Sequence, residues 1–214
     1  KILVDELAPQ SHATDVTLAT GKKIAGANTQ FKITGGANLN HLQTDGAGNV
    51  TWVAPPVAGL SHVSQWRLTA DFTNSVTPLI SNLVPVSTPV GYGKLPASAP
   101  MALDAFGKFT FPVTGTWYVI FSVLGRTANY DSYESYIRTT TNNATYTTAT
   151  TILGHNENWT DWNLAYNSLL FNVTDTTQCK CDFSIVVSDS AVTTKGHADQ
   201  NETYMTFIRL GDPL

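Results

Sequence analysis

A nine-residue run of β-forming residues, Thr116 to Leu124, constrains the fold of this chain more than any other segment. Alternate side chains of a strand point to opposite faces of the sheet. Here both faces are largely apolar, with Trp117, Val119, Phe121 and Val123 on one and Tyr118, Ile120, Ser122 and Leu124 on the other. The run therefore predicts a strand covered on both faces, either inside a sandwich by a second layer or by another protein chain.

The composition favours sheets over helices. Charged residues make up 13% of the chain, about half the usual share, and much of the polarity comes from Thr, Asn and Ser, which suit strands and turns. A net charge of −4 with only 12 Lys and Arg does not provide the basic patch with which proteins bind the phosphates of nucleic acid. No run approaches the roughly 20 apolar residues of a membrane helix. We expect an all-β protein with neither nucleic acid nor a membrane as partner.

Long β-forming runs, joined by Gly, Pro, Asn and Asp turns, fill the chain after Gln65. Their number, eight to ten, is what a double-sheet jelly roll requires. The expected strands are 66–72, 76–86, 101–104, 109–111, 116–124, 133–140, 144–152, 164–173, 180–188 and 203–210.

The pattern G-K-F-T-F-P-V-x-G-x-W-Y-V-x-F at residues 107–121 resembles the central strand pair of TNF-like jelly rolls. These are the trimeric globular heads shared by tumour necrosis factor, the complement globular heads and several viral spikes. The resemblance extends to 167–173, 179–188 and 202–210 and covers roughly 65–214. It implies a TNF-like β-sandwich head whose hydrophobic last strand lies centrally in the inner sheet.

The strand at 116–124 and the last strand carry more apolar side chains than one sandwich interior needs. A closed three-fold interface would cover the excess. We therefore predict a homotrimer. The residues expected at its interface are Tyr118, Ile120, Tyr204 and Phe207.

The N-terminal segment differs from the rest of the chain, because glycines divide it into short apolar runs that cannot close a sheet alone. The double proline Pro55-Pro56 marks its end. We expect a slender β shaft or base segment over residues 1–59, supported by partner chains or a docking surface, and a head over residues 60–214. The chain does not begin with Met, so we expect it to be a fragment of a longer protein.

Residues 35–52, GGANLNHLQTDGAGNVTW, are similar to a segment of phage tail-fibre and virion appendage proteins of the form G-G-x-N-x-x-x-L-x-T-D-G-x-G-N-x-x-W. The same residues also fit a plain β-hairpin. Its turn would be residues 45–49, where Gly and Asn tolerate positive φ. The two interpretations are compatible.

Four aromatic residues are candidates for receptor contact, because loop aromatics offer a large contact area at low entropy cost. Tyr130 and Tyr133 precede a polar stretch that contains Trp159 and Trp162. The alternative is that both tryptophans fold back and cap the open end of the sandwich.

The two cysteines, Cys179 and Cys181, are one residue apart in an expected strand. Residues two apart in an extended chain lie near or beyond the Cα separation that a disulfide tolerates. We expect two reduced, partly buried thiols, with a strained disulfide as the alternative. A lone C-x-C lacks the second ligand pair of a zinc site.

No catalytic motif is present. His155, Glu157 and Asp161 cluster in one loop and His197 with Asp199 in another, but neither spacing matches a metal-ligand signature. Asp131 and Glu134 would be the carboxylates of a glycosidase pair. We expect no enzymatic activity, no metal and no cofactor.

These features together predict a virion structural appendage, a trimeric spike or tail fibre that projects from the capsid at the virion surface. Within that class the vertex spike of a tectivirus-like phage combines a slender stalk with a TNF-like knob. Its role would be host attachment or support of the attachment protein. Its partners would be other capsid or vertex proteins and a host-surface receptor or glycan. The alternative is a secreted carbohydrate-binding or adhesin module.

Limited proteolysis tests the division between segment and head. Cleavage within 55–59 is expected to release a trimeric, resistant C-terminal core, because every long β run lies after residue 65. The N-terminal piece is expected to be digested further. The measurement is native mass after digestion. An N-terminal piece that survives as a folded trimer while the C-terminal piece falls to monomers would contradict this division.

Overall fold

The computed structural model describes residues 40–44, 50–53, 60–87, 100–126, 131–155 and 162–214. The chain divides into two units, Lys1–Pro56 and Val57–Leu214. The described residues form strands, turns and loops without a helix, so none of them forms a helix able to span a membrane. The predicted all-β class is confirmed.

The N-terminal unit contains a β-hairpin. Strands β1 (His41–Thr44) and β2 (Val50–Val53) pair antiparallel, with His41 opposite Val53 and Thr44 opposite Val50. The predicted hairpin is therefore present, while its expected turn, 45–49, lies outside the described residues. Leu42 and Val50 are 38% and 61% exposed. A two-stranded hairpin with exposed apolar side chains is marginally stable by itself, which agrees with the expected need for a partner.

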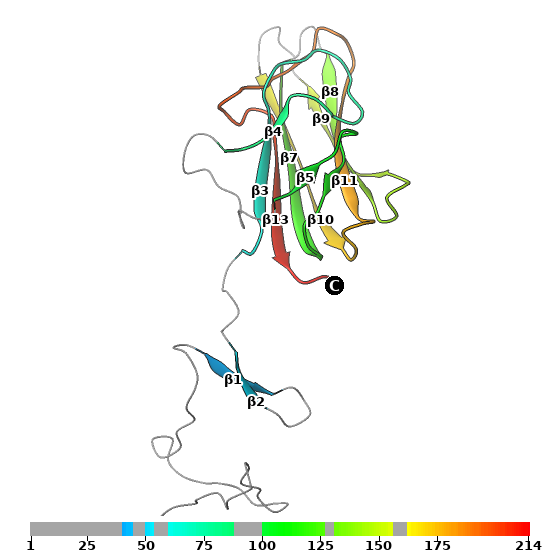
Figure 1. Ribbon diagram of the computed structural model, residues 1–214. Helices are drawn as coiled ribbons and strands as arrows, with labels where there is room; N and C mark the ends of the chain where they lie inside the picture. The colour runs from blue at the N-terminus through cyan, green and yellow to red at the C-terminus, as the bar shows by residue number, and fades with distance from the viewer. Residues whose placement is uncertain (1–39, 45–49, 54–59, 88–99, 127–130, 156–161) are drawn as a thin grey trace, which may run out of the picture. The chain divides into compact units, whose positions relative to one another are not determined.

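The C-terminal unit is a sandwich of two antiparallel sheets (Figure 1). In the first sheet the last strand lies between two others, which confirms its predicted central place. In order, the first sheet contains β10 (Trp162–Val173), β7 (Gly115–Arg126), β13 (Tyr204–Gly211), β3 (Val63–Leu68) and β4 (Leu83–Pro85), with β12 (Thr193–Thr194) also paired to β7. The second sheet contains β5 (Ala102–Leu103), β6 (Phe109–Thr110), β11 (Lys180–Val187), β8 (Ser132–Thr140) and β9 (Thr147–His155).

Aromatic rings fill the space between the sheets. Phe183 of β11 lies 4.9 Å from Phe121 of β7 and 5.3 Å from Phe109 of β6, measured between ring centroids. Such pairs contribute about 0.5–1.5 kcal/mol each beyond the area they bury. Phe207 of β13 is also fully buried here, 5.1 Å from Phe109. Its predicted place at a chain interface is therefore wrong, because this side chain points into the core.

Both cysteines are free thiols buried in the same core. Burial raises the pKa of the Cys181 thiol well above its ordinary value. The thiols therefore behave as small apolar side chains.

Two sequence-based expectations for the strands need correction. Residues 109–111 and 116–124 are not neighbours, because β6 pairs with β5 and β11 while β7 lies in the other sheet. Pro112, which lacks an N–H, lies in the crossing between the sheets. The expected long strand at 76–86 is reduced to β4, because Pro78 cannot donate to a ladder and Asn82 has a φ of +57°.

Tyr133 ties the two sheets together. Its ring is fully buried, and its hydroxyl lies 2.7 Å from the Asn163 carbonyl and 3.2 Å from the Val123 carbonyl in the opposite sheet. The ring fits because Gly125 and Gly154 flank it, where a Cβ would overlap its atoms. The predicted receptor contact through Tyr133 is therefore wrong. Burial raises the pKa of Tyr133 to about 12.

Removing the Tyr133 hydroxyl with Tyr133→Phe is expected to cost about 0.5–1.5 kcal/mol of unfolding free energy. Gly154→Ala is expected to cost about 1–3 kcal/mol, because the ring must move. Urea unfolding midpoints at neutral pH measure both effects.

The stability of the fold should also depend on pH through Tyr133. Because its folded-state pKa is raised, the contribution of Tyr133 to the free energy of unfolding is complete below pH ~10 and is lost as the pH rises through about 12. In Tyr133→Phe the free energy of unfolding should fall less steeply over this alkaline range. Unchanged midpoints in both variants would contradict this role.

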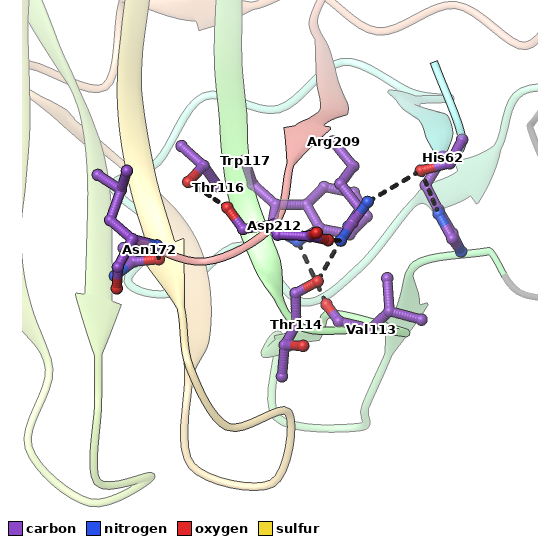
Figure 2. Close-up of polar contacts among 10 residues, drawn as sticks. His62, Val113, Thr114, Thr116, Trp117, Asn172, Arg209 and Asp212 are labelled. Carbon is purple, nitrogen blue, oxygen red and sulfur yellow. Dashed lines mark hydrogen bonds and ion pairs between the residues drawn. The ribbon is translucent and has the colours of Figure 1, made fainter. Parts of the chain in front are cut away.

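Arg209 joins the first and last segments of the head (Figure 2). Its Nε donates to the Thr114 carbonyl at 2.9 Å, and Nη2 lies 2.6 Å from the Asp212 carboxylate. Its backbone N–H donates to the carbonyl of His62, just before β3. The pKa of His62 is lowered by burial and by the nearby Arg209 charge. The chain thus enters and leaves the head at the same end of the sandwich.

Because the Asp212 side chain is 92% exposed, its ion pair with Arg209 is screened and is worth less than about 1 kcal/mol. Asp212→Asn should therefore barely change the urea midpoint. Arg209→Lys removes the guanidinium Nε–H that donates to the Thr114 carbonyl. This should lower the free energy of unfolding by on the order of 1 kcal/mol. Equal effects of the two variants would show that the ion pair, rather than the hydrogen bond to Thr114, ties this end.

Candidate association surface

The candidate site is the outer face of the first sheet, formed by the side chains that alternate with the core residues. Its members come from four neighbouring strands. They are Leu164, Tyr166, Ser168 and Leu170 of β10, Tyr118, Ile120, Ser122 and Leu124 of β7, Tyr204, Thr206 and Ile208 of β13, and Val63 and Gln65 of β3.

The register of the strands sets these side chains in rows across the sheet. One row runs Leu170, Tyr118, Ile208 and Val63. The next runs Ser168, Ile120, Thr206 and Gln65, and the third runs Tyr166, Ser122, Tyr204 and Arg67. Side chains directly opposite each other in neighbouring strands contact one another, so the rows form one continuous surface.

Large apolar side chains on this face are exposed to solvent. Leu164 is 59% exposed, Tyr166 47% and Leu170 65%. Arg67 of β3 is the charged member of the three rows, but it is only 1% exposed and its Nη1 donates to the Ala198 carbonyl at 3.2 Å. Arg126 lies opposite Trp162 at the end of the face. The exposed side chains of the three rows are uncharged. Contiguous exposed apolar patches of this kind mark sites of interaction with another protein.

The outer face of the second sheet has the opposite chemistry. Arg138 donates two hydrogen bonds, of 2.7 and 2.8 Å, to the carboxylate of Asp182. Lys180 donates to Thr110, and Tyr136 donates to Glu134. Leu153 and Val186 are exposed on this face as well, but Glu134 lies between them in the register. The first sheet is therefore the candidate association surface.

The tyrosines of the association surface hold polar groups within an apolar surrounding. The hydroxyls of Tyr118 and Tyr166 lie 3.4 Å apart. The hydrogen bond with Tyr118 raises the pKa of Tyr166 to about 12. The Ser122 hydroxyl, opposite Tyr166 in the register, is buried without a hydrogen-bond partner among the described residues.

The predicted interface residues Tyr118, Ile120 and Tyr204 lie together on this face, on two neighbouring strands. Their direct role in a trimer stays a prediction. Sequence reasoning missed Leu164, Tyr166 and Leu170 of β10. The available signal was that large apolar residues alternate there with Ala165 and Asn167, which fill the inner side.

Of the predicted receptor contacts, Tyr130 and Trp159 lie outside the described residues. Trp162 begins β10 and is 43% exposed. The Lys195 Nζ lies 5.7 Å, and the Arg126 guanidinium carbon 6.0 Å, from the centre of its ring. Trp162 is thus an accessible aromatic ring beside two positive charges.

The candidate metal ligands do not gather where the structure describes them. His197 accepts hydrogen bonds at Nδ1 from the backbone N–H groups of Asp199 and Gln200. His155 is exposed at the end of β9, while Glu157 and Asp161 lie outside the described residues. Within the described ranges no group of three or more His, Cys, Asp or Glu side chains could hold a metal ion.

Comparison with known proteins defines the fold. No protein-family model and no curated protein matches the chain. The structure of the Eiger TNF from S. frugiperda superposes with a TM-score of 0.51 at 11% identity, over 71% of this chain and 94% of that one. This head has the TNF-like jelly-roll fold. Murine APRIL is less similar, with a TM-score of 0.46 and 13% identity over 70% of this chain and 98% of that one.

Proposed function

We propose that the chain is a non-enzymatic appendage whose TNF-like heads associate as a homotrimer through the outer face of the first sheet. The observation that carries the proposal is the surface of tyrosine, leucine and isoleucine side chains on four neighbouring strands, in which the one arginine of the three rows, Arg67, is buried. Three copies of this face around a three-fold axis would cover one another, and closed cyclic symmetry leaves no copy of the face uncovered.

Burial of this face supplies the driving force. Each square ångström of apolar surface removed from water contributes about 25 cal/mol. Leu164, Tyr166 and Leu170 keep roughly half or more of their surface exposed in the single chain. Three chains would bury nine such side chains together with the tyrosines of β7 and β13, which offsets the entropic cost of association.

The biological setting we propose is the surface of a virion. Residues 35–52 are similar to a segment of phage tail-fibre and appendage proteins, and the described part of that segment forms a hairpin with exposed apolar residues. Such a segment suits a shaft or base that joins the head to other capsid or vertex proteins. The head would then attach to a host receptor or glycan or support the protein that does.

A matched pair of leucine variants tests the assembly. Leu164 and Leu153 are each 59% exposed on a strand, but Leu164 lies on the outer face of the first sheet and Leu153 is opposite Glu134 in the second. Leu164→Asp is expected to dissociate the trimer, because an unpaired carboxylate in each buried interface is costly. Leu153→Asp should leave it intact.

Light scattering after size exclusion measures the outcome. The wild type and Leu153→Asp should have three times the chain mass of 23.1 kDa, and Leu164→Asp should have the mass of one chain. Far-UV circular dichroism controls for folding of both variants. A monomeric wild type, or dissociation by both variants, would refute the proposed interface.

The virion setting has its own test. Antibodies against the head should detect the chain in particles purified by density gradient, and immunogold labelling should place it at their surface. Recovery of the chain only as free protein in the culture medium would favour the alternative, a secreted carbohydrate-binding or adhesin module.

A further inference from the structure

An open groove of about 460 Å³ lies beside the second sheet. One side is apolar and consists of Pro78, Ile80 and Phe106, while the other contains Lys108, Arg138 and Tyr146. None of these residues belongs to the outer face of the first sheet. The groove therefore remains available in the trimer proposed above, and the inference below does not depend on that trimer.

Phe106 is held in solvent by an ordered turn. The Asp104 carboxylate accepts the backbone N–H groups of Phe106 and Lys108, each at 2.9 Å. Gly107 has a φ of +79°, and a Cβ there would lie 2.7 Å from the Leu79 carbonyl oxygen. The turn thus packs closely on the neighbouring segment. A phenylalanine that is 71% exposed adds little to folding, yet the turn fixes its position at the edge of the groove.

Ile80 continues the apolar side and is 54% exposed. Together with Pro78 and Phe106 it offers a wall for an apolar side chain. A volume of 460 Å³ is within the range of pockets that hold small ligands or peptide side chains.

The opposite side of the groove has an excess of positive charge. Arg138 is occupied by its paired hydrogen bonds to Asp182. The Lys108 Nζ lies 5.1 Å from the centre of the Tyr146 ring and makes no hydrogen bond or ion pair with a described residue. Lys108 and Arg138 thus share one carboxylate that lines the groove, Asp182. The Asp104 carboxylate, in the turn with Lys108, accepts two backbone N–H groups. A ligand carboxylate would therefore give the Lys108 ammonium a direct partner.

We propose that this groove binds a short peptide segment of a partner protein in which a large apolar side chain stands next to a carboxylate. The apolar side chain packs on Phe106 and Ile80, and the carboxylate pairs with Lys108. The apolar wall of Pro78, Ile80 and Phe106 favours an apolar peptide side chain over a sugar, because a sugar would bury hydroxyl groups there without hydrogen-bond partners.

Two dipeptides that differ only in charge test the proposal, acetyl-Phe-Asp-amide and acetyl-Phe-Asn-amide. The readout is the Ile80 δ1 methyl resonance of the full chain, with the buried Ile185 methyl as the internal control. Saturable shifts of Ile80 are expected at dipeptide concentrations on the order of millimolar. The Asp dipeptide should bind about threefold more tightly than the Asn dipeptide, as befits one exposed ion pair.

Variants identify the contacts. Lys108→Gln should abolish the preference for the Asp dipeptide, and Phe106→Ala should weaken both dipeptides without lowering the melting temperature. Lys195→Gln is the matched control, because Lys195 pairs with Asp71 away from the groove, and it should change neither. Absence of Ile80 shifts up to about 10 mM dipeptide, or a preference that survives Lys108→Gln, would overturn the proposal. Tighter binding of glucuronate than of the Asp dipeptide would overturn the peptide assignment in favour of an acidic sugar.

Discussion

The aromatic contact between the two sheets decides which surfaces the head presents. Phe121 packs on Phe183 across the sandwich, and Phe207 joins the same cluster. Since the side-chain period of a strand is two, inward Phe121 and Phe207 require that Ile120 and Tyr204 point outward. A shift of one residue would exchange the two sets. The apolar outer face of the first sheet is thus a geometric consequence of the core.

This dependence explains what the sequence could and could not predict. The residues at 116–124 specify a strand with two apolar faces, and the sandwich and the central place of β13 follow the TNF-like pattern. The sequence did not predict that Phe207 is buried in the core, because β13 is apolar on both faces. Which of its alternate side chains point inward is set only by its pairing with β7. Tyr133 was misplaced because the space for its ring comes from Gly125 and Gly154, which lie in opposite sheets and far apart in the chain.

The two sheets divide the chemistry of the head. The first sheet turns rows made mostly of tyrosine, serine and aliphatic side chains outward, whereas the second carries the Arg138–Asp182 pair and the groove beside Phe106. The groove escapes sequence analysis because its walls come from four separate parts of the chain, around 78–80, 105–108 and 138–146 and at Asp182. The proposed assembly surface on one sheet and the proposed peptide groove on the other can therefore change independently.

The Arg209 tie also has a mechanical consequence. Tension transmitted along the chain from residue 60 enters β3 at Val63, and β3 is held by β13 through five residue pairs from Val63–Ile208 to Arg67–Tyr204. Hydrogen bonds in an antiparallel pair lie perpendicular to the strands, so a pull along β3 loads all of them in shear at once. Arg209 fastens the same corner through the His62 carbonyl. A pull along β3 therefore meets the whole β3–β13 ladder and the Arg209 contact together.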